Sequence, residues 1–444
     1  MAKEGTGMAI VNSIRAGASK AYRDAVPELG LKNLLDVKSA ILDFTPTYNE
    51  FISVFFNKIA LSLMDMRAFS NPFRSLVKGG NPLGGVIQDT HVNPAIAIPY
   101  DINATSRLLH NYRPDVAVEY FTLNRKDLFA VTRARDELEL AFTSFDALDD
   151  FFAALIDSLY SGNEIREFEL WKALFASAYL SNVFKTVAVA APVDQESAMK
   201  FLLTLQNISF AMTFPSGDYN NFQELAAAQN KAVNPAITWT PQANQIIIMD
   251  SRYAATIGLY VKASAFNVSY TELEGRILYV DNLMVTGLLA IICDERAPQV
   301  RDNRREFRDF ENGATLTLNS FFHVWQYYNI RLWANAVALY DPTAEKAVIT
   351  VNNGQQLSIG LDTKKQFDYS VTYHDREISP YLSFMTTTNN LVMSYDPEEK
   401  KITVATSKDS APGEYIVLVS ARVDIGDGKF ETNSALVTVK INPV

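Results

Sequence analysis

Cysteine and histidine are both scarce in this chain. Cys293 is the one cysteine among 444 residues, and the four histidines are His91, His110, His323 and His374. A single thiol excludes an intrachain disulfide and any site built from paired cysteines. The histidines lack the close HxH or HxxxH spacing with which this residue type often binds metal. The sequence therefore predicts no metal site and a packed, unreactive Cys293.

The motifs of common enzymes are also missing. The sequence contains no GxSxG, no HExxH and no GxxxxGK[ST], the signatures of hydrolases, zinc proteases and nucleotide-binding proteins. The glycines of residues 79–85 (GGNPLGG) precede no helix that could cradle a phosphate. The acidic residues 424–431 (DIGDGKFE) fail the spacing of a calcium-binding loop and predict a β-turn. We therefore expect neither an enzyme nor a bound cofactor.

Long apolar runs are absent as well. No stretch reaches the roughly 18 apolar residues of a membrane span, and the first residues lack the apolar core of a signal peptide. A hydrophobic fraction of 48% and a charged fraction of 20% indicate a folded globular protein. The net charge of −10 argues against tight, sequence-specific binding of nucleic acid and leaves only loose contact. The length of 444 residues predicts two or three domains.

Helical and strand patterns are mixed along the chain without regular alternation. Residues 1–45 predict a weakly structured lead-in with one or two short helices. Apolar periodicity then predicts helices over 145–159, 164–181, 195–210 and 251–266, and strands over 183–189, 245–249, 276–280, 288–293 and 321–339. The charge-dense residues 294–308 form either a solvated loop or an intersubunit salt-bridge network. The irregular mixture favours an α+β fold over a doubly wound sheet.

The predicted helix over 164–181 has the strongest pattern. Its apolar positions include Phe168, Trp171 and Phe175, and its charged positions include Glu167 and Lys172. This spacing predicts a long amphipathic helix with an apolar face and a charged face.

The character of the chain changes near residue 342, where helical periodicity ends. Seven β-rich runs follow, at 347–351, 357–361, 366–373, 391–395, 401–405, 414–423 and 434–441. Such a series of short strands between turn signals predicts an immunoglobulin-like sandwich. Because the region contains no cysteine pair, it is not of the antibody type.

Residues 70–99 form an unusual arm. Four prolines and four glycines interrupt any helical period, yet apolar residues such as Phe73 and Leu76 exceed what a solvated linker needs. The early part of the arm is basic, with Arg74 and Lys78, in a chain of acidic net charge. We therefore expect an irregular arm that packs against the acidic surface of a neighbouring subunit.

Three segments together carry a family likeness. Residues 71–85 (NPFRSLVKGGNPLGG) resemble the NPL…K.G..PLG arm of major capsid proteins from small short-tailed phages of the Picovirinae type. Residues 321–338 (FFHVWQYYNIRLWANAVA) resemble the YYHVWQ…RFANAVA segment of the same proteins. Residues 246–293 resemble the axial domain of tailed-phage capsids in the order of their strands, Asp turn and helix. The likeness covers most of the chain, weakly before residue 45 and by architecture after 342.

The resemblance implies the Hong Kong 97 phage-type capsid fold, of the α+β class, with an all-β Ig-like sandwich at the C-terminus. The implied parts are an N-terminal arm region (1–65), an E-loop region (66–125), a peripheral domain with a spine helix (126–185 and 311–340), a mainly axial domain (186–310) and an Ig-like domain on the outer surface (341–444).

The resemblance also implies site residues. The implied intersubunit contacts of the E-loop are Phe73, Arg74, Leu76, Lys78, Pro82 and Leu83, and those of the spine helix are Phe168, Trp171 and Phe175. Some capsids of this fold crosslink a loop lysine to an asparagine of a neighbour. Lys78 is the available lysine, but no acidic catalyst can be assigned, so we expect non-covalent assembly.

The implied function is that of a structural major capsid protein. It would assemble into the icosahedral or prolate head around double-stranded DNA, as hexamers and pentamers, with scaffolding and portal proteins as partners and no membrane involvement. Its contact with the packaged DNA would be non-specific. The protein would assemble in the cytoplasm of the bacterial host and reside in the virion. The alternatives are a bacterial nanocompartment shell protein and a surface adhesin built on the Ig-like domain.

Overall fold

The computed structural model divides the chain into two compact units. Unit 1 comprises 1–74, 126–168 and 302–325, and unit 2 comprises 75–125, 169–301 and 326–444. The structure describes residues 6–30, 33–42, 46–47, 50–51, 54, 69–79, 85–98, 110–134, 160–231, 233–254, 256–257, 276–312, 317–352, 354–378, 380–386, 391–426 and 429–443. Within those ranges, none of the helices has the length and hydropathy needed to cross a bilayer.

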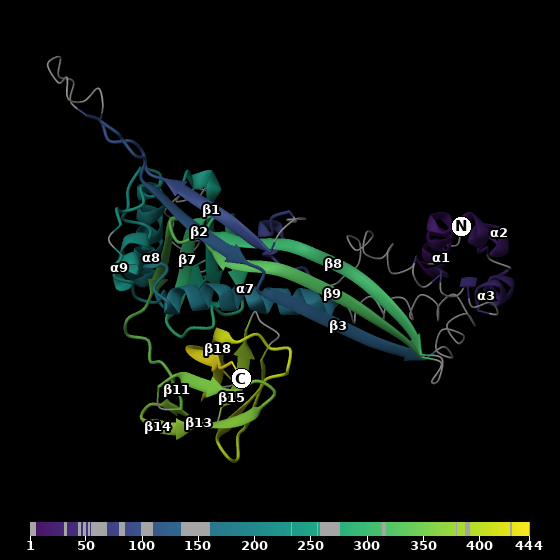
Figure 1. Ribbon diagram of the computed structural model, residues 1–444. Helices are drawn as coiled ribbons and strands as arrows, with labels where there is room; N and C mark the ends of the chain where they lie inside the picture. Colours follow the sequence, from purple (N-terminus) through teal and green to yellow (C-terminus); the bar gives the residue numbers. More distant parts are fainter. Residues whose placement is uncertain are drawn as a thin grey trace. The chain divides into compact units, whose positions relative to one another are not determined.

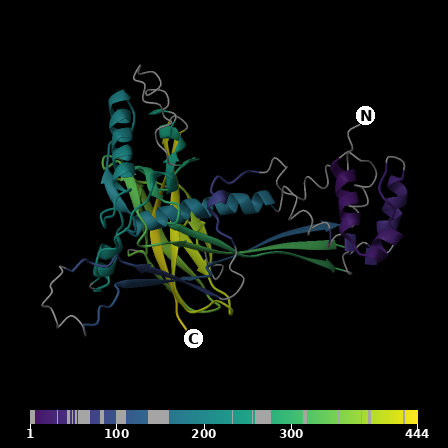
Figure 2. The same cartoon turned by 90° about the horizontal axis from the view of Figure 1, so that it is seen from above.

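Unit 1 begins with three helices, α1 (Thr6–Gly17), α2 (Lys20–Ala25) and α3 (Leu34–Leu42). Ser19 caps α2 by accepting a hydrogen bond from the backbone N–H of Tyr22 at 3.1 Å. The helices share a core to which each contributes buried side chains, among them Val11, Ile14, Tyr22, Val37 and Ile41. Figure 2 shows them side by side in purple. The expectation of a weakly structured lead-in is therefore wrong, because these segments bury apolar side chains against one another.

Three long strands, β3 (Arg125–Ala134), β9 (Thr317–Ile330) and β8 (Pro298–Asn312), form a sheet in the order β3-β9-β8 (Figure 1). Stacking of Phe307 on Phe322, with ring centroids 4.4 Å apart, joins β8 to β9 in unit 1. Of the two alternatives for 294–308, the solvated loop is therefore wrong from Pro298 onward, where the charged residues lie on strand β8, and the intersubunit salt-bridge network stays a prediction. The predicted helix over 145–159 lies outside the described residues.

The helix α7 (Gly162–Leu180) matches the predicted helix over 164–181. Its predicted charged face is only partly solvated. Glu167 and Lys172 are buried, whereas the apolar Ile165 is 48% exposed. Burial of the two charged side chains is possible because each has an ionic partner, described below.

Unit 2 contains a five-stranded mixed sheet in the order β4-β10-β7-β5-β6. Its strands are β4 (Lys185–Ala188), β5 (Gln245–Asp250), β6 (Arg276–Val280), β7 (Leu288–Asp294) and β10 (Ala336–Tyr340). Every residue of the central strands β5 and β7 is buried, as their continuous apolar sequences predict. The predicted helix after β5 is present over the described residues of 251–257, and the rest of that prediction lies outside the described residues.

The helix α8 (Gln195–Ala211) covers this sheet. Asp194 begins it with a capping box, in which its carboxylate accepts the N–H of Ser197 at 2.8 Å. The inner face of α8 contributes Phe201 and Leu205 to the same core as Leu289 of the sheet. Two short helices, α9 (Phe222–Ala228) and η5 (Gln242–Asn244), complete this part (Figure 1 labels α8 and α9).

The C-terminal part of unit 2 is a β-sandwich of two sheets, β11-β13-β17-β16, with β14 on β13, and β12-β19-β18-β15. Its strands are β11 (Val348–Val351), β12 (Gln356–Ile359), β13 (Lys364–Tyr373), β14 (Arg376–Ile378), β15 (Tyr381–Met385), β16 (Val392–Asp396), β17 (Lys401–Ala405), β18 (Gly413–Gly426) and β19 (Lys429–Ile441). Inward side chains of both sheets form one core. The seven predicted strands are all present, and β14 and β15 were missed. The predicted β-turn at 427–428 lies outside the described residues, but β18 and β19 pair up to Gly426 and Lys429 on either side of it.

The arm is more regular than the sequence predicts. Its described residues contain a short 3-10 helix, η2 (Arg74–Leu76), and a strand, β1 (Val86–Val92). Strand β1 pairs in antiparallel fashion with β2 (Val116–Thr122) along its whole length. The prediction of an irregular arm is therefore wrong over β1, because backbone pairing with a strand beyond the arm supplies the order that the local sequence lacks.

Candidate assembly interface

The root of the arm is fixed within unit 1. The side-chain oxygen of Asn71 accepts a hydrogen bond from the N–H of Phe73 at 3.0 Å. The backbone carbonyl of Asn71 accepts one from the N–H of Arg74, also at 3.0 Å. Such an Asx turn is typical of an Asn-Pro sequence. The turn directs the fully buried Phe73 onto Phe168 of α7, with ring centroids 5.9 Å apart.

A four-membered ion cluster holds the same root. Arg74 donates to Glu167 at 3.0 Å and to Asp302 at 3.0 Å. Arg305 approaches the other carboxylate oxygen of Glu167 at 2.9 Å and Asp302 at 3.4 Å. The Glu167 side chain has no exposed surface, so its charge is balanced by two guanidinium groups rather than by water. The pKa of the nearby Glu164 is raised, mainly by burial and secondly by repulsion from Glu167.

Beyond the root, Leu76 and Lys78 lie in unit 2. Leu76 is 8% exposed, and the backbone N–H of Lys78 donates to the carbonyl of Val300 at 2.9 Å. Burial, followed by repulsion from Arg331 and Arg301, lowers the pKa of Lys78 to about 8. The Lys78 ammonium is therefore held in a partly buried and basic setting of its own chain.

The outward face of the β1–β2 hairpin carries no charged residue. Strand register places its exposed residues opposite one another as the pairs Val86–Thr122, Gln88–Tyr120, Thr90–Val118 and Val92–Val116. Val118 is 43% exposed and Tyr120 is 64% exposed. The chain continues past β1 with Ile96, which is 90% exposed. An uncharged face with several exposed large apolar side chains is typical of an interaction site rather than of a solvated hairpin.

The inward face of the hairpin holds it to the body of unit 2. Asp89 and Glu119 are opposite each other in register. The guanidinium of Arg331 donates to Asp89 at 3.0 Å, and the Leu332 N–H donates to Glu119 at 3.4 Å. Burial raises the pKa of Glu119 to about 7, against the lowering effect of that N–H, and the Asp89 charge adds to the increase.

A second attachment lies at the far end of the hairpin. The amide of Asn93 donates to Asp115 at 2.6 Å and accepts the N–H of Ile237 at 2.9 Å. Asn234 also donates to Asp115, at 3.1 Å, and these two amides lower the pKa of the Asp115 carboxyl. Both attachments therefore hold the hairpin with its uncharged face turned away from its own body.

Of the three predicted spine-helix residues, Trp171 and Phe175 lie in the interior and Phe168 is half-buried. Trp171 and Phe175 are buried with ring centroids 5.9 Å apart, and Trp171 also meets Tyr328 edge to face at 6.2 Å. Lys172 of the same helix pairs with Asp281 at 2.8 Å. These side chains stabilise the subunit itself.

The predicted E-loop residues separate into two groups. Phe73 and Leu76 are buried by their own chain, Arg74 is paired within it, and Lys78 is held beside Arg301. Their part in contacts between subunits stays a prediction. The remaining two residues, Pro82 and Leu83, lie outside the described residues.

Sequence reasoning missed the residues of the hairpin face. The alternation in 116–122 (VAVEYFT) was available as a strand signal. The partner strand gives no such signal, since VIQDTHV is apolar only at its ends. The pairing of the two strands could not be predicted because 23 residues, 93–115, separate them in the sequence.

The described residues offer little for chemistry. In that part of the chain, no cluster of three or more histidine, cysteine, aspartate or glutamate side chains could hold a metal ion. Burial, with the charge of Asp294, raises the pKa of the Cys293 thiol and so disfavours the reactive thiolate.

Known proteins similar to this chain are phage major capsid proteins. The family model described as Phi29-like phage major capsid protein matches residues 11–340. The major capsid protein of Bacillus phage PZA is 26% identical over 350 residues, which are 77% of this chain and 75% of that protein. The major capsid protein of Streptococcus phage Cp-1 is 22% identical over 346 residues, covering 73% of this chain and 92% of that protein. Nothing in these matches supports the nanocompartment or adhesin alternative.

The fold of this chain is also similar to that of a chain in a solved phage structure. One chain in the solved structure of the head fiber and inner core protein gp22 of native bacteriophage P68 aligns with a TM-score of 0.50 at 14% identity. The alignment covers 63% of this chain and 87% of that one.

Proposed function

The chain belongs to the Phi29-like phage major capsid protein family, and on that basis we propose how its copies are held together in a shell. The protein is a structural component of the phage capsid. Its fold combines helices with several sheets in the α+β manner. Proteins of this kind act through their contact surfaces, so the argument for function rests on the hairpin rather than on a pocket.

The observation that carries the proposal is the uncharged outward face of β1–β2. The hairpin is held from its inward side by Arg331 and Asn93, so its backbone is fixed before any partner arrives. A fixed apolar surface loses little conformational entropy on binding. In our proposal this face lies on the body of an adjacent copy, and the E-loop residues Arg74 and Lys78 set the position of the arm from its root.

The finer architecture follows the Hong Kong 97 phage type in this proposal. Residues 1–65 are the N-terminal arm region and 66–125 the E-loop region. Residues 126–185 and 311–340 form the peripheral domain, and 186–310 form mainly the axial domain. Residues 341–444 form an Ig-like domain on the outer surface. Two facing sheets with one core support the last assignment.

The proposed assembly is non-covalent. Hexamers and pentamers of this chain enclose double-stranded DNA, and scaffolding and portal proteins take part while the shell forms in the host cytoplasm. The acidic net charge of −10 supports only non-specific contact with the genome. An enzymatic activity has no place in this proposal.

The test is a matched pair of substitutions in the full chain. We expect Val118→Asp, on the hairpin face, to leave a folded subunit that forms no closed particles, since a desolvated charge at an interface is costly. Val392→Asp is the control, because Val392 is an exposed valine of β16 in the sandwich, at 68% exposure. Negative-stain electron microscopy counts the particles and circular dichroism checks the fold. Normal shells from Val118→Asp would contradict the proposal.

A further inference from the structure

The loop between β6 and β7, residues 281–287 (DNLMVTG), is unusually constrained. Leu283, Met284 and Val285 are nearly buried, although loops generally run over the surface. Met284 has a φ of 58°, in the left-handed region that a bulky side chain rarely adopts. Such a conformation persists only when surrounding contacts hold it. The question is therefore which part of the molecule holds this loop.

The C-terminal sandwich makes the contacts that hold it. The hydroxyl of Ser434 donates to the carbonyl of Met284 at 2.5 Å, so the strained residue itself is bound. The N–H of Thr286 donates to the side chain of Asn433 at 3.3 Å, and its hydroxyl donates to the carbonyl of Thr432 at 3.4 Å. These contacts come from three consecutive residues of β19, which pair with 420–422 of β18, and Ser434 and Asn433 are both buried.

The linker to the sandwich rests on the same loop. The N–H of Asp341 donates to the carbonyl of Gly287 at 2.7 Å. Gly287 has a φ of 82°, and a Cβ atom there would lie 2.8 Å from the Cβ of Ala344. The linker and β19 therefore contact the loop from separate parts of the chain.

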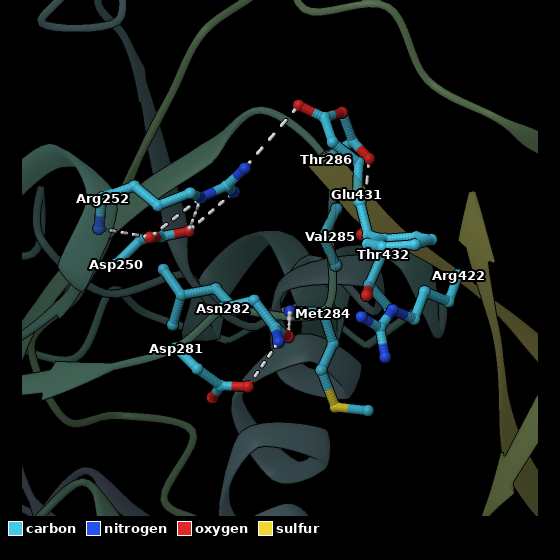
Figure 3. A pocket seen from close by; sticks show the side chains of 12 residues that line it. Asp250, Arg252, Asp281, Asn282, Met284, Val285, Thr286, Arg422, Glu431 and Thr432 are labelled. Atoms are coloured by element: carbon cyan, nitrogen blue, oxygen red, sulfur yellow. Dashed lines mark hydrogen bonds and ion pairs between the residues drawn. The ribbon is translucent and has the colours of Figure 1, made fainter. Parts of the chain in front are cut away.

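The other end of the loop reaches the long helix α7. The N–H of Met284 donates to the side chain of Asn282 at 3.1 Å, and the Asn282 amide donates to Asp281 at 2.7 Å. Lys172 of α7, whose side chain is 8% exposed, donates to Asp281 at 2.8 Å. Figure 3 shows Asp281, Asn282 and Met284 following one another along one side of the pocket. A continuous series of polar contacts thus runs from Ser434 to Lys172.

A polar pocket of about 220 Å³ lies between this loop and the sandwich. Across it, Arg252 points toward Glu431 of β19, with their charged atoms 3.9 Å apart, and Arg252 is also paired with the buried Asp250 (Figure 3). The Arg252–Glu431 pair therefore adds a longer ionic contact beside the hydrogen bonds between the sandwich and the loop.

We propose that the C-terminal sandwich clamps the loop 281–287 in its strained conformation and so fixes Asp281 against Lys172 of α7. The sandwich is then a structural part of the subunit that holds the loop against α7, and not a domain joined to the rest only by a flexible linker. This role is independent of what the outer surface of the sandwich touches.

Hydrogen exchange of the full chain, followed by mass spectrometry, tests the clamp. We expect Ser434→Ala to speed exchange in 281–287 by about tenfold, the effect of losing the buried hydrogen bond to Met284, and to speed exchange in the turn of α7 around Lys172. The same substitution removes the contact of Ser434 with Ser420, so exchange in the β18–β19 ladder should rise as well. Ser394→Ala is the control, because Ser394 lies on β16 of the sandwich, away from the β18–β19 ladder. This control should leave both regions at the wild-type rate.

A second variant approaches the contact from the loop. Thr286→Val removes the hydroxyl that reaches Thr432 while keeping the side-chain shape, and we expect the same two regions to exchange faster. Unchanged exchange in 281–287 in both variants would overturn the proposal. Faster exchange confined to the sandwich, with α7 unaffected, would overturn it as well. Should Ser434→Ala unfold the sandwich, Thr286→Val alone decides between these outcomes.

Discussion

The β1–β2 and β18–β19 hairpins are both antiparallel pairs in unit 2, yet they differ in what covers them. In β18–β19 the apolar residues Val417, Val419 and Val437 are completely buried by the facing sheet of the sandwich. In β1–β2 the corresponding valines are about half exposed, and the face toward the body combines the buried Phe121 with the polar and charged residues Asp89 and Glu119.

The difference shows that each hairpin is stabilised by a different kind of contact. The sandwich hairpin is held by apolar burial, which is worth roughly 25 cal/mol per Å². The arm hairpin is held by directed polar contacts such as Asp89–Arg331 together with the buried Phe121, and its outward valines stay uncovered. Only the second arrangement leaves an apolar surface for another copy of the chain.

Substituting one valine in each hairpin gives the largest contrast. Val419→Asp places a charge in a site with no exposed surface, and we expect a loss of more than about 4 kcal/mol in the free energy of unfolding. Val118→Asp, at 43% exposure, should change that free energy by less than about 1 kcal/mol. Urea unfolding of the two purified variants measures both values. Similar losses in both would show that the β1–β2 face is covered within its own chain.

Much of the fold could be predicted because its signals are local. The helix α8 follows from its apolar period and from Asp194 at its start, and β5 and β7 follow from short, continuous apolar runs. The sandwich strands were found where apolar and polar residues alternate. The short strand β14, with the sequence REI, offers no such alternation, and its pairing with β13 is what makes it a strand.

The candidate interface was harder to predict because its contacts are distant in sequence. Arg74 was expected to meet the acidic surface of a neighbouring subunit, which stays a prediction. Within its own chain it pairs with Glu167, 93 positions away, and with Asp302, 228 positions away. Composition indicates that a basic arm needs acidic partners and does not say which chain supplies them. The hairpin face depends in the same way on a pairing between strands that local pattern does not reveal.

Removing one ionic contact from each hairpin should give an intermediate effect. Asp89→Asn deprives Arg331 of its carboxylate partner in a pair whose side chains are only 17% and 20% exposed, and we expect a loss of about 1–3 kcal/mol. Glu414→Gln removes the exposed Lys440 pair of β18–β19 and should cost less than about 0.5 kcal/mol. Urea unfolding gives the energies, and hydrogen exchange should localise the Asp89→Asn effect to β1–β2. Equal costs would show that polar contacts hold both hairpins alike.

The smallest expected effect is a dependence on pH that arises at Glu119 of the arm hairpin. Because burial raises the pKa of Glu119 from its ordinary 4.5 to about 7, the folded state binds more protons than the unfolded state between these two values. Stability therefore falls as pH rises from 4.5 to 7 and receives no further change from this group above 7. Glu119→Gln lacks the titrating carboxyl and keeps Asp89 and Arg331, the two charged groups that act on Glu119. We expect the free energy of unfolding of this variant to rise above that of the wild type between pH 4.5 and 7, by about 1–2 kcal/mol at pH 7 after allowing for solvent screening.

Urea unfolding at pH 5, 6, 7 and 8 measures this difference, and Glu414→Gln is the control variant, expected to follow the wild-type curve. A constant difference between Glu119→Gln and the wild type would mean that Glu119 is as well solvated as the carboxylates of the sandwich hairpin.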